Sequence, residues 1–425
     1  RDIDSLSGMS YSERMSRMCR GVSEVTAAVL PLGFIAFGGP QAHVALLHTS
    51  LVEKLEWVED GTFVELLALG HALPGPTSSQ MVVALAASKG GPLGALIAFV
   101  LWSLPAFVVL TIAGMGTSYV DISTVWYLKG LPPAAVALVF SAAYKIGNKT
   151  CKNSVTQCIA LLSALAVVLC SAEDRIPIHF FDILYPALLV AGGITSACLL
   201  SNSEGLTQRG LDVGLSRWGG ACLILIWAGI FVGLSMARFY FESTNILVLL
   251  AETFWRVGSV VFGGGQVVLP MMLTQIVGPG WLDSASFYSG MALTQASPGP
   301  FFNFAAFIGG AVDGIPGAVV SQLALFGPGV ILILAVSPFW LKIRSHAKVQ
   351  GALKGINAAA AGLIFAALIM LYQNTVTTGA DAVVVMVTGC LGFGIPVKVE
   401  APIAIGLGGI IGAVFAFYEV GSNSV

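Results

Sequence analysis

The chain has 425 residues, of which 56% are hydrophobic and only 10% are charged. Soluble domains carry roughly 25% charged residues, so this chain lacks the polar surface of a soluble enzyme or a disordered protein. Its net charge of −2 argues against nucleic acid as a partner, and its 50 glycines and 19 prolines are typical of transmembrane helices. The composition predicts an all-α polytopic membrane protein that is embedded in the lipid bilayer.

Thirteen apolar segments come close to the length of about 20 residues that a helix needs to cross a hydrocarbon core of about 30 Å. In chain order they cover residues 22–47, 63–88, 92–116, 131–147, 155–172, 179–200, 217–237, 245–275, 285–309, 316–341, 353–373, 380–396 and 401–419. The connections between them are brief. We therefore expect about 13 transmembrane segments and no separate soluble domain.

Basic residues indicate the orientation of these segments, because cytosolic loops carry an excess of Lys and Arg. With thirteen spans, 15 of the 20 basic residues fall on the side that holds the N-terminal tail, and 4 fall on the opposite side. The remaining one, Arg256, lies within the eighth span. We expect a cytosolic N-terminus in the plasma membrane, with an organelle membrane as the alternative.

Two parts of the chain repeat each other at an offset of 224–225 residues. The matching landmarks are FGGPQ at 37–41 with FGGGQ at 262–266, Trp57 with Trp281, PGP at 74–76 with PGP at 298–300, Pro92 with Pro316, and LKG at 128–130 with LKG at 353–355. The repeats start seven spans apart, an odd number, so the second enters the membrane in the opposite sense. Such inverted repeats are typical of secondary transporters.

This repeat divides the chain into four parts. We expect a basic N-terminal tail at 1–21, a first transmembrane repeat at 22–200, a linker with one extra span at 201–244, and a second transmembrane repeat at 245–425.

The FGG and PGP motifs lie inside apolar segments and predict broken helices. Proline removes a backbone donor, and adjacent glycines allow conformations that other residues resist. Unwound backbone at membrane depth is tolerated only where it lines a cavity or is buried in protein. A broken helix offers the free N–H groups and the positive dipole end of a half-helix, which attract an anion. The alternative interpretation is close helix packing through small residues.

Polar side chains that donate hydrogen bonds follow these breaks, so we expect the anion to bind there. The expected substrate-binding residues are Gly38, Gly39, Pro40, Gln41, His43, Pro74, Gly75, Pro76, Thr77, Ser78, Gln80, Arg256, Gly263, Gly264, Gly265, Gln266, Pro298, Gly299, Pro300 and Asn303. For Arg256 an ion pair with Glu252, four residues earlier on the same helix, is the alternative. For His43 the alternative is a satisfied packing residue.

His71 and Glu65 are candidates for proton coupling, because both titrate and lie near the first PGP motif. His43 and His48 lack a third ligand, so no metal site is expected. The chain carries no GxSxG, HExxH or Walker sequence, so we expect neither an enzyme nor a cofactor.

The motifs resemble those of the chromate ion transporter (CHR) superfamily. The resemblance rests on LGFIAFGGPQAH at 32–43, ALPGPTSSQ at 72–80, RVGSVVFGGGQVVLP at 256–270 and ALTQASPGPFFNFAAFIGG at 292–310. It implies two homologous halves of opposite orientation and transport of the chromate oxyanion, in exchange for sulfate or driven by the proton-motive force. Position 71 departs from the pattern, since the family more often has Gln there.

The sequence therefore predicts a secondary active transporter of tetrahedral oxyanions, chromate and sulfate, that works by alternating access as an anion exchanger or a proton-coupled carrier. Chromate and sulfate are similar dianions, so the resemblance indicates a substrate class more firmly than a substrate. The alternatives are a passive anion channel and a transporter of another inorganic oxyanion or a small organic anion. A homodimer is left open.

Overall fold

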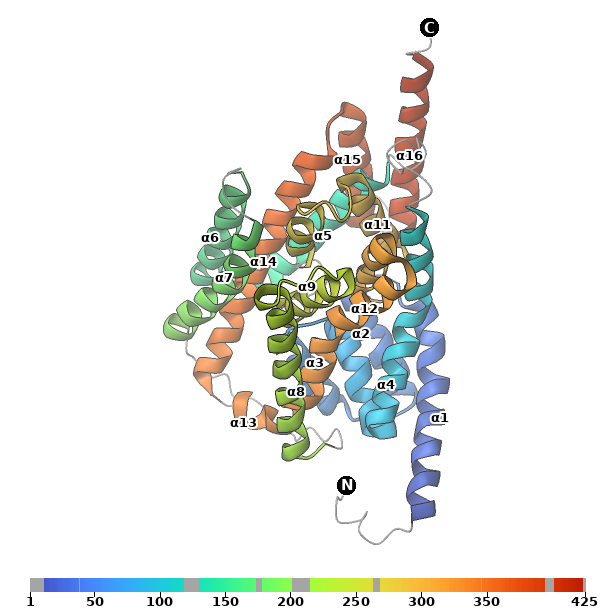
Figure 1. Ribbon diagram of the computed structural model, residues 1–425, viewed down its shortest axis with the longest axis vertical. Coiled ribbons are helices and arrows are strands. Elements are labelled where there is room, and N and C mark those ends of the chain that lie inside the picture. The colour runs from blue at the N-terminus through green and yellow to red at the C-terminus, as the bar shows by residue number, and fades with distance from the viewer. Residues whose placement is uncertain are drawn as a thin grey trace.

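A computed structural model describes residues 11–37, 39–117, 130–172, 178–200, 215–262, 268–344, 346–393 and 401–422. Across these ranges the regular structure is helical and contains no strand, so the prediction of an all-α fold is confirmed (Figure 1). The expected site residues Gly38, Gly263, Gly264, Gly265 and Gln266 lie outside the described ranges.

The elements run in chain order as α1 (Tyr11–Ile35), α2 (Gly39–Leu47), η2 (His48–Lys54), α3 (Asp60–Ala72), α4 (Thr77–Gly116), α5 (Leu131–Thr150), α6 (Ser154–Ser171), α7 (Ile178–Leu199), α8 (Arg217–Ser235), η5 (Met236–Tyr240), α9 (Ile246–Val260), α10 (Val268–Met272), η7 (Leu273–Val277), α11 (Ser284–Ala296), η8 (Phe301–Asn303), α12 (Phe304–Val336), η9 (Ser337–Phe339), α13 (Trp340–Arg344), α14 (Ala347–Thr375), α15 (Gly379–Phe393) and α16 (Ala401–Ser422).

Five helical stretches in the described part are long and apolar enough to cross a membrane: Thr77–Gly116, Ser154–Ser171, Arg217–Tyr240, Phe301–Phe339 and Ala347–Thr375. Shorter apolar helices cover Ile183–Leu199, Gly379–Leu391 and Ile403–Phe415. This set agrees with a polytopic membrane protein, while the count of 13 spans stays a prediction.

The helix α4 is a hairpin and not a single rod. Its 40 residues would reach about 60 Å as one helix, twice the hydrocarbon thickness. Gly91 breaks it with a φ of 61°, and a Cβ on Gly94 would lie 3.0 Å from the carbonyl oxygen of Ala86. Residues eight apart approach this closely only if the chain turns back between them. The break falls between the expected segments 63–88 and 92–116.

The helix α12 folds back in the same way. Its backbone leaves the helical conformation at Asp313 and Gly314, and Gly309 packs directly on the carbonyl of Gly317. The two hairpins α4 and α12 pack against each other, with α1 along α4 and α9 along α12. Together these four elements form the centre of the molecule.

The two halves of the chain are interleaved. The helices α6 and α7 of the first half pack on α14 of the second, while α15 and α16 of the second half pack on α5 of the first (Figure 1). The helix α5 also packs on α14, and α8 packs on α9 and α12. The sequence halves are therefore not separate lobes.

Glycine allows the central helices to touch through their backbones. Gly33 of α1 packs directly on the carbonyl of Leu101 in α4, and Gly258 of α9 packs on the carbonyl of Leu325 in α12. These two contacts lie at equivalent positions of the sequence repeat. They allow backbone approach of the kind seen between small residues in membrane helices.

We predict that Gly33→Ala lowers the thermal stability of the purified protein, because the added Cβ would push α1 away from α4 at a typical overpacking cost of about 1–3 kcal/mol. The matched control is Gly229→Ala in α8, where nothing lies within 4 Å of the added Cβ. The midpoint of thermal unfolding in detergent is the measurement. Equal midpoints for the two variants would contradict the packing described for α1 and α4.

Candidate functional site

The first PGP motif meets the second half of the chain at a backbone hydrogen bond. The Gly75 N–H donates to the carbonyl oxygen of Val261, which follows α9, over 2.8 Å. Gly75 has a φ of +119°, which favours glycine, and a Cβ there would lie 2.7 Å from the Cα of Gly329 in α12. Only glycine therefore allows this loop to reach both Val261 and α12.

The second PGP motif makes the same contact in reverse. The Gly299 N–H donates to the carbonyl oxygen of Ala36, which follows α1, over 2.7 Å, and Gly299 has a φ of +102°. Ala36 and Val261 precede the two FGG motifs at equivalent positions of the repeat. Each half thus donates from its PGP loop to the end of the broken helix of the other half. The amides of Gly75 and Gly299, expected to face an anion, bond to protein here.

Helices begin directly after both PGP loops, and both beginnings are buried. Pro76 and Pro300 are the N-cap residues, and neither helix has a side-chain cap among the described contacts. Thr77, Ser78 and Asn303 are at most 7% exposed. Uncapped N–H groups and a positive dipole end in a buried place are suited to an anion.

His43 connects α2 to both motifs. Its Nε2 lies 2.9 Å from the carbonyl oxygen of Ala36, and its Nδ1 lies 3.3 Å from Ser78 Oγ. The carbonyl can only accept, so Nε2 carries a proton. The ring is buried and meets Trp102 edge to face, with centroids 5.4 Å apart. His43 therefore lies in the centre, where a packing role and a binding role are compatible.

Thr77 and Gln80, the other predicted polar residues of α4, bond to backbone carbonyls. Thr77 Oγ1 donates to Gly70, and Gln80 Nε2 donates to both Pro74, at 2.8 Å, and Gly329, at 3.2 Å. Gln80 thus ties the PGP loop of one half to α12 of the other.

On the opposite hairpin, the amide of Asn303 meets a residue that sequence reasoning missed. Gln322 Nε2 donates to Asn303 Oδ1 over 2.6 Å, and Asn303 is fully buried. Gln322 lies 19 residues away on the return arm of the hairpin, so no local pattern in the sequence signals the contact.

In the first FGG motif, Gly39 has a φ of +79° with open space around it, and the side chain of Gln41 lies outside the described part of the structure.

Arg256 belongs to a buried charged cluster. Its Nε donates to Glu252 Oε1 over 2.6 Å, as expected for the pair four residues apart, and its Nη2 donates to Gln275 Oε1 over 3.2 Å. Arg238 of η5 also binds Glu252, through Oε2, and donates to Thr253. Two guanidinium groups thus share one carboxylate that is 1% exposed.

This cluster joins η5 of the linker to α9 and η7 of the second half. No pattern in the sequence indicates Gln275, and Arg238 is marked there only as a basic residue at the end of the extra span. The contacts of Arg256 support a role in holding η7 next to α9. Its predicted role as an anion ligand stays a prediction.

The two coupling candidates lie on α3. His71 Nδ1 donates to the carbonyl of Leu67 over 2.8 Å, and Lys149 Nζ of α5 lies 3.2 Å from Nε2. A charged ammonium donates to a ring nitrogen only when that nitrogen is unprotonated, so His71 is neutral in this arrangement. Glu65 is 6% exposed and has a partner. Lys149 is a further residue that the sequence analysis did not assign.

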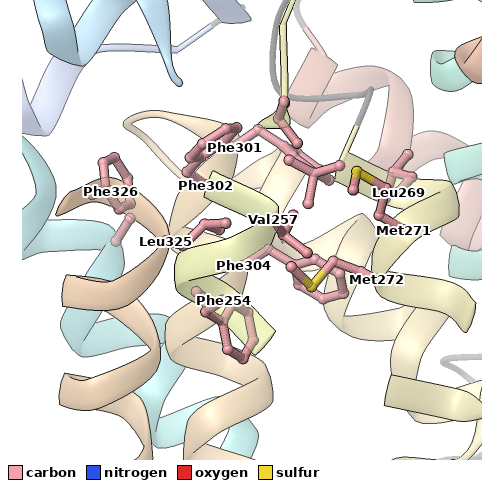
Figure 2. Close-up of a cluster of buried hydrophobic side chains, with 14 of the residues drawn as sticks. Phe254, Val257, Leu269, Met271, Met272, Phe301, Phe302, Phe304, Leu325 and Phe326 are labelled. Atoms are coloured by element: carbon pink, nitrogen blue, oxygen red, sulfur yellow. The ribbon is translucent and has the colours of Figure 1, made fainter. Parts of the chain in front are cut away.

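The second half surrounds its part of the centre with apolar side chains. Figure 2 shows Phe254 and Val257 of α9 with Leu269, Met271 and Met272 of α10, Phe301 and Phe302 of η8, and Phe304, Leu325 and Phe326 of α12. The equivalent start of α4 reads Thr77, Ser78, Ser79 and Gln80 instead of Phe301, Phe302, Asn303 and Phe304. In the described part of the chain, no group of three His, Cys, Asp or Glu could hold a metal ion.

The fold and this site define a helical membrane protein with two related halves that meet at paired helix breaks. The family described as Chromate transporter matches residues 23–197 and again residues 248–413. This chain therefore belongs to the chromate transporter family, and the resemblance seen in the motifs is confirmed. Membership indicates a transport function and not catalysis.

Relatives match over most of the chain. A probable chromate transport protein of Synechococcus elongatus is 26% identical over 399 residues, which cover 93% of this chain and 95% of that protein. A chromate transport protein of Pseudomonas aeruginosa is 28% identical, with 83% and 81% covered, and one of Cupriavidus metallidurans is 26% identical, with 85% of each covered. No solved structure matches the chain.

We predict that Glu252→Gln destabilises the protein by about 3–5 kcal/mol, because it leaves the guanidinium groups of Arg238 and Arg256 buried without their carboxylate. The control is Glu53→Gln, which removes a carboxylate that is 56% exposed beside His48 and costs about 1 kcal/mol or less. Thermal unfolding in detergent measures both. A stable Glu252→Gln variant would mean that the cluster does not hold α9 in place.

Proposed function

We propose that this protein is a secondary active transporter that carries tetrahedral oxyanions, chromate and sulfate, across a membrane by alternating access. It works as an anion exchanger or as a proton-coupled carrier. The observation that carries this proposal is the reciprocal pair of hydrogen bonds, Gly75 to Val261 and Gly299 to Ala36. They join the ends of broken helices from the two halves at one buried place.

The pairing supports an inverted repeat. Equivalent groups from the two halves exchange equivalent bonds, as expected where two similar units are related by a twofold axis. With an odd number of spans between their starts, that axis lies in the membrane plane. Secondary transporters with such repeats hold the substrate between the halves near the midplane, at discontinuous helices. Rocking of one half against the other would open the site to each side in turn.

Helix beginnings and neutral donors are suited to a dianion that must also be released. The buried starts of α4 and of η8 with α12 supply N–H groups, and Ser78, His43 and Asn303 lie beside them. A site of this kind recognises a tetrahedral dianion and discriminates weakly between chromate and sulfate. The names of the relatives favour chromate as one substrate.

A passive anion channel is the second candidate, since the same helix ends could line a pore. The described centre favours a carrier, because His43, Ser78 and Asn303 are closed off from solvent at 1%, 2% and 0% exposure. We place the protein in the plasma membrane with a cytosolic N-terminus. This orientation follows from the distribution of basic residues in the sequence.

The test is uptake of radiolabelled sulfate into proteoliposomes that contain sulfate, chromate or neither. We expect internal chromate or sulfate to accelerate uptake, because a carrier returns faster when loaded. Protein-free liposomes are the control. Flux that follows only the membrane potential, without acceleration by internal anion, would indicate a channel. Absence of flux under every loading, in folded protein, would overturn the proposed substrate class.

Proton coupling generates a separate prediction. If His71 or Glu65 carries the coupled proton, His71→Gln or Glu65→Gln transports sulfate at a rate that no longer depends on pH. Glutamine is tolerated at the equivalent place, since Gln295 of the second half corresponds to His71. The initial rate between about pH 6 and pH 8 is the measurement. Variants that keep the pH profile of the parent would exclude both residues as coupling groups.

A further inference from the structure

The two backbone hydrogen bonds between the halves, Gly75 to Val261 and Gly299 to Ala36, are called crossings below. They differ in the side-chain groups that lie beside them. At the crossing of Gly75 with Val261, both bonds from Gln80 Nε2 go to carbonyls, and Gln80 Oε1 has no partner among the described residues. At the crossing of Gly299 with Ala36, Asn303 Oδ1 is occupied by Gln322, and Asn303 Nδ2 has no partner. Gln80 at the first crossing thus presents an acceptor and Asn303 at the second presents a donor, while Gln322 Oε1 beside Asn303 also has no described partner.

Asn303 Nδ2 lies directly beside the second crossing. A Cβ on Gly299 would lie 3.0 Å from it, and the same Cβ would lie 3.6 Å from the carbonyl oxygen of Trp102. Asn303 is fully buried, so its amino group is shielded from water without an acceptor among the described residues. A buried donor in this state typically costs about 1–3 kcal/mol, which a bound acceptor would recover.

Trp102 supplies a second donor of this kind. Its side chain is fully buried, and its indole Nε1 has no hydrogen-bond partner in the described structure. The ring packs edge to face on His43, whose Nε2 bonds to the same Ala36 carbonyl that accepts from Gly299. An indole N–H can only donate, so it fits an acceptor and nothing else.

The equivalent places of the other crossing lack the two nitrogen donors. Gly33 packs on Leu101 as Gly258 packs on Leu325, so Trp102 corresponds to Phe326, which contacts Phe99 and Phe302. His43 corresponds to Val268, and Asn303 corresponds to Ser79, whose buried hydroxyl has no partner among the described residues. One crossing therefore has two nitrogen donors, where the other has one hydroxyl and an apolar ring.

We propose that the oxyanion binds only at the crossing of Gly299 with Ala36, where the indole N–H of Trp102 and the amino group of Asn303 donate to its oxygens. Gln322 is a positioning residue, because its bond to Asn303 Oδ1 leaves the Nδ2 amino group of Asn303 on the side of Gly299. The crossing of Gly75 with Val261 is a structural joint, and Gln80 ties it to α12. This proposal rests on the proposed function and names the binding residues within it.

The test uses sulfate exchange in proteoliposomes, with the KM for sulfate and the maximal rate measured separately. Trp102→Phe keeps an aromatic ring beside His43 but removes the N–H together with part of the ring. Asn303→Ser removes the amide and leaves a hydroxyl on a side chain one bond shorter, as at the equivalent position of the first half. We expect each to raise the KM at least about tenfold, the usual effect of losing one hydrogen bond to a charged group, with a smaller change in maximal rate.

Asn303→Asp supplies a sharper contrast, because it keeps the shape and replaces the donor by a negative charge. We expect no measurable sulfate exchange from this variant. The matched controls are Trp340→Phe and Asn153→Asp. Trp340→Phe makes the same loss of ring volume and removes a buried indole N–H that has no partner in the described part of the chain, and Asn153 is the N-cap of α6. Both controls should keep the KM of the parent within about twofold.

The outcomes separate the two proposals. If the parent protein exchanges sulfate and both Trp102→Phe and Asn303→Ser keep its KM, the assignment of the donors is wrong while the proposed function stands. If the parent exchanges no oxyanion, the proposed function itself fails. Should Asn303→Asp not fold, Asn303→Ser and Trp102→Phe still decide the assignment.

Discussion

The centre of this protein depends on a pair of backbone hydrogen bonds in which each PGP glycine donates to the end of a broken helix in the other half. Both glycines need a positive φ, and both bonds cross between sequence halves more than 180 residues apart. The helices α1 and α9 can end in the buried centre because the carbonyls of Ala36 and Val261 each accept a hydrogen bond there. A buried carbonyl without a partner would cost several kcal/mol.

The hairpins α4 and α12 follow from this arrangement. Each hairpin starts at a PGP loop in the buried centre, and Gly91 and Gly314, both with positive φ, supply the sharp turns at which the chain folds back. The hairpins then lie against each other and against the broken helices, with glycine backbones in direct contact. The outer helices are exchanged between the halves, so neither half could keep its packing alone.

The two halves have similar backbones and different chemistry. The first half carries His43, Trp102 and the His71–Lys149 pair, where the second half has Val268, Phe326, Gln295 and Asn374. The second half instead carries the buried pair of Glu252 and Arg256, and Arg238 joins this pair from η5, which follows the extra helix α8 of the linker. A carrier that binds one anion between two similar units needs only one of the two crossings to hold it. The other is then free to serve as a joint.

The sequence by itself determined the membrane class, the repeat and the helix breaks. Composition excludes a soluble fold, the offset of 224–225 residues aligns the motifs, and Gly and Pro mark where helices end, because each of these signals is local or periodic. It also indicated Asn303, Ser78 and His43, which follow the breaks directly. The Arg256–Glu252 pair was likewise visible, since four residues on a helix make one turn.

Only the tertiary structure decided which of these residues meet. Nothing local predicts that Gly299 reaches Ala36, that Gln322 holds Asn303, or that Arg238 joins Glu252, because each contact depends on how separate helices pack. The bonds of the Gly75 and Gly299 amides could not be predicted for the same reason, since their acceptors come from the other half. No sequence pattern marks Trp102 as a binding residue, because an aromatic residue in an apolar helix is expected to face lipid or to pack in the core. Only the packing shows that its indole N–H is buried next to His43 without a partner among the described residues.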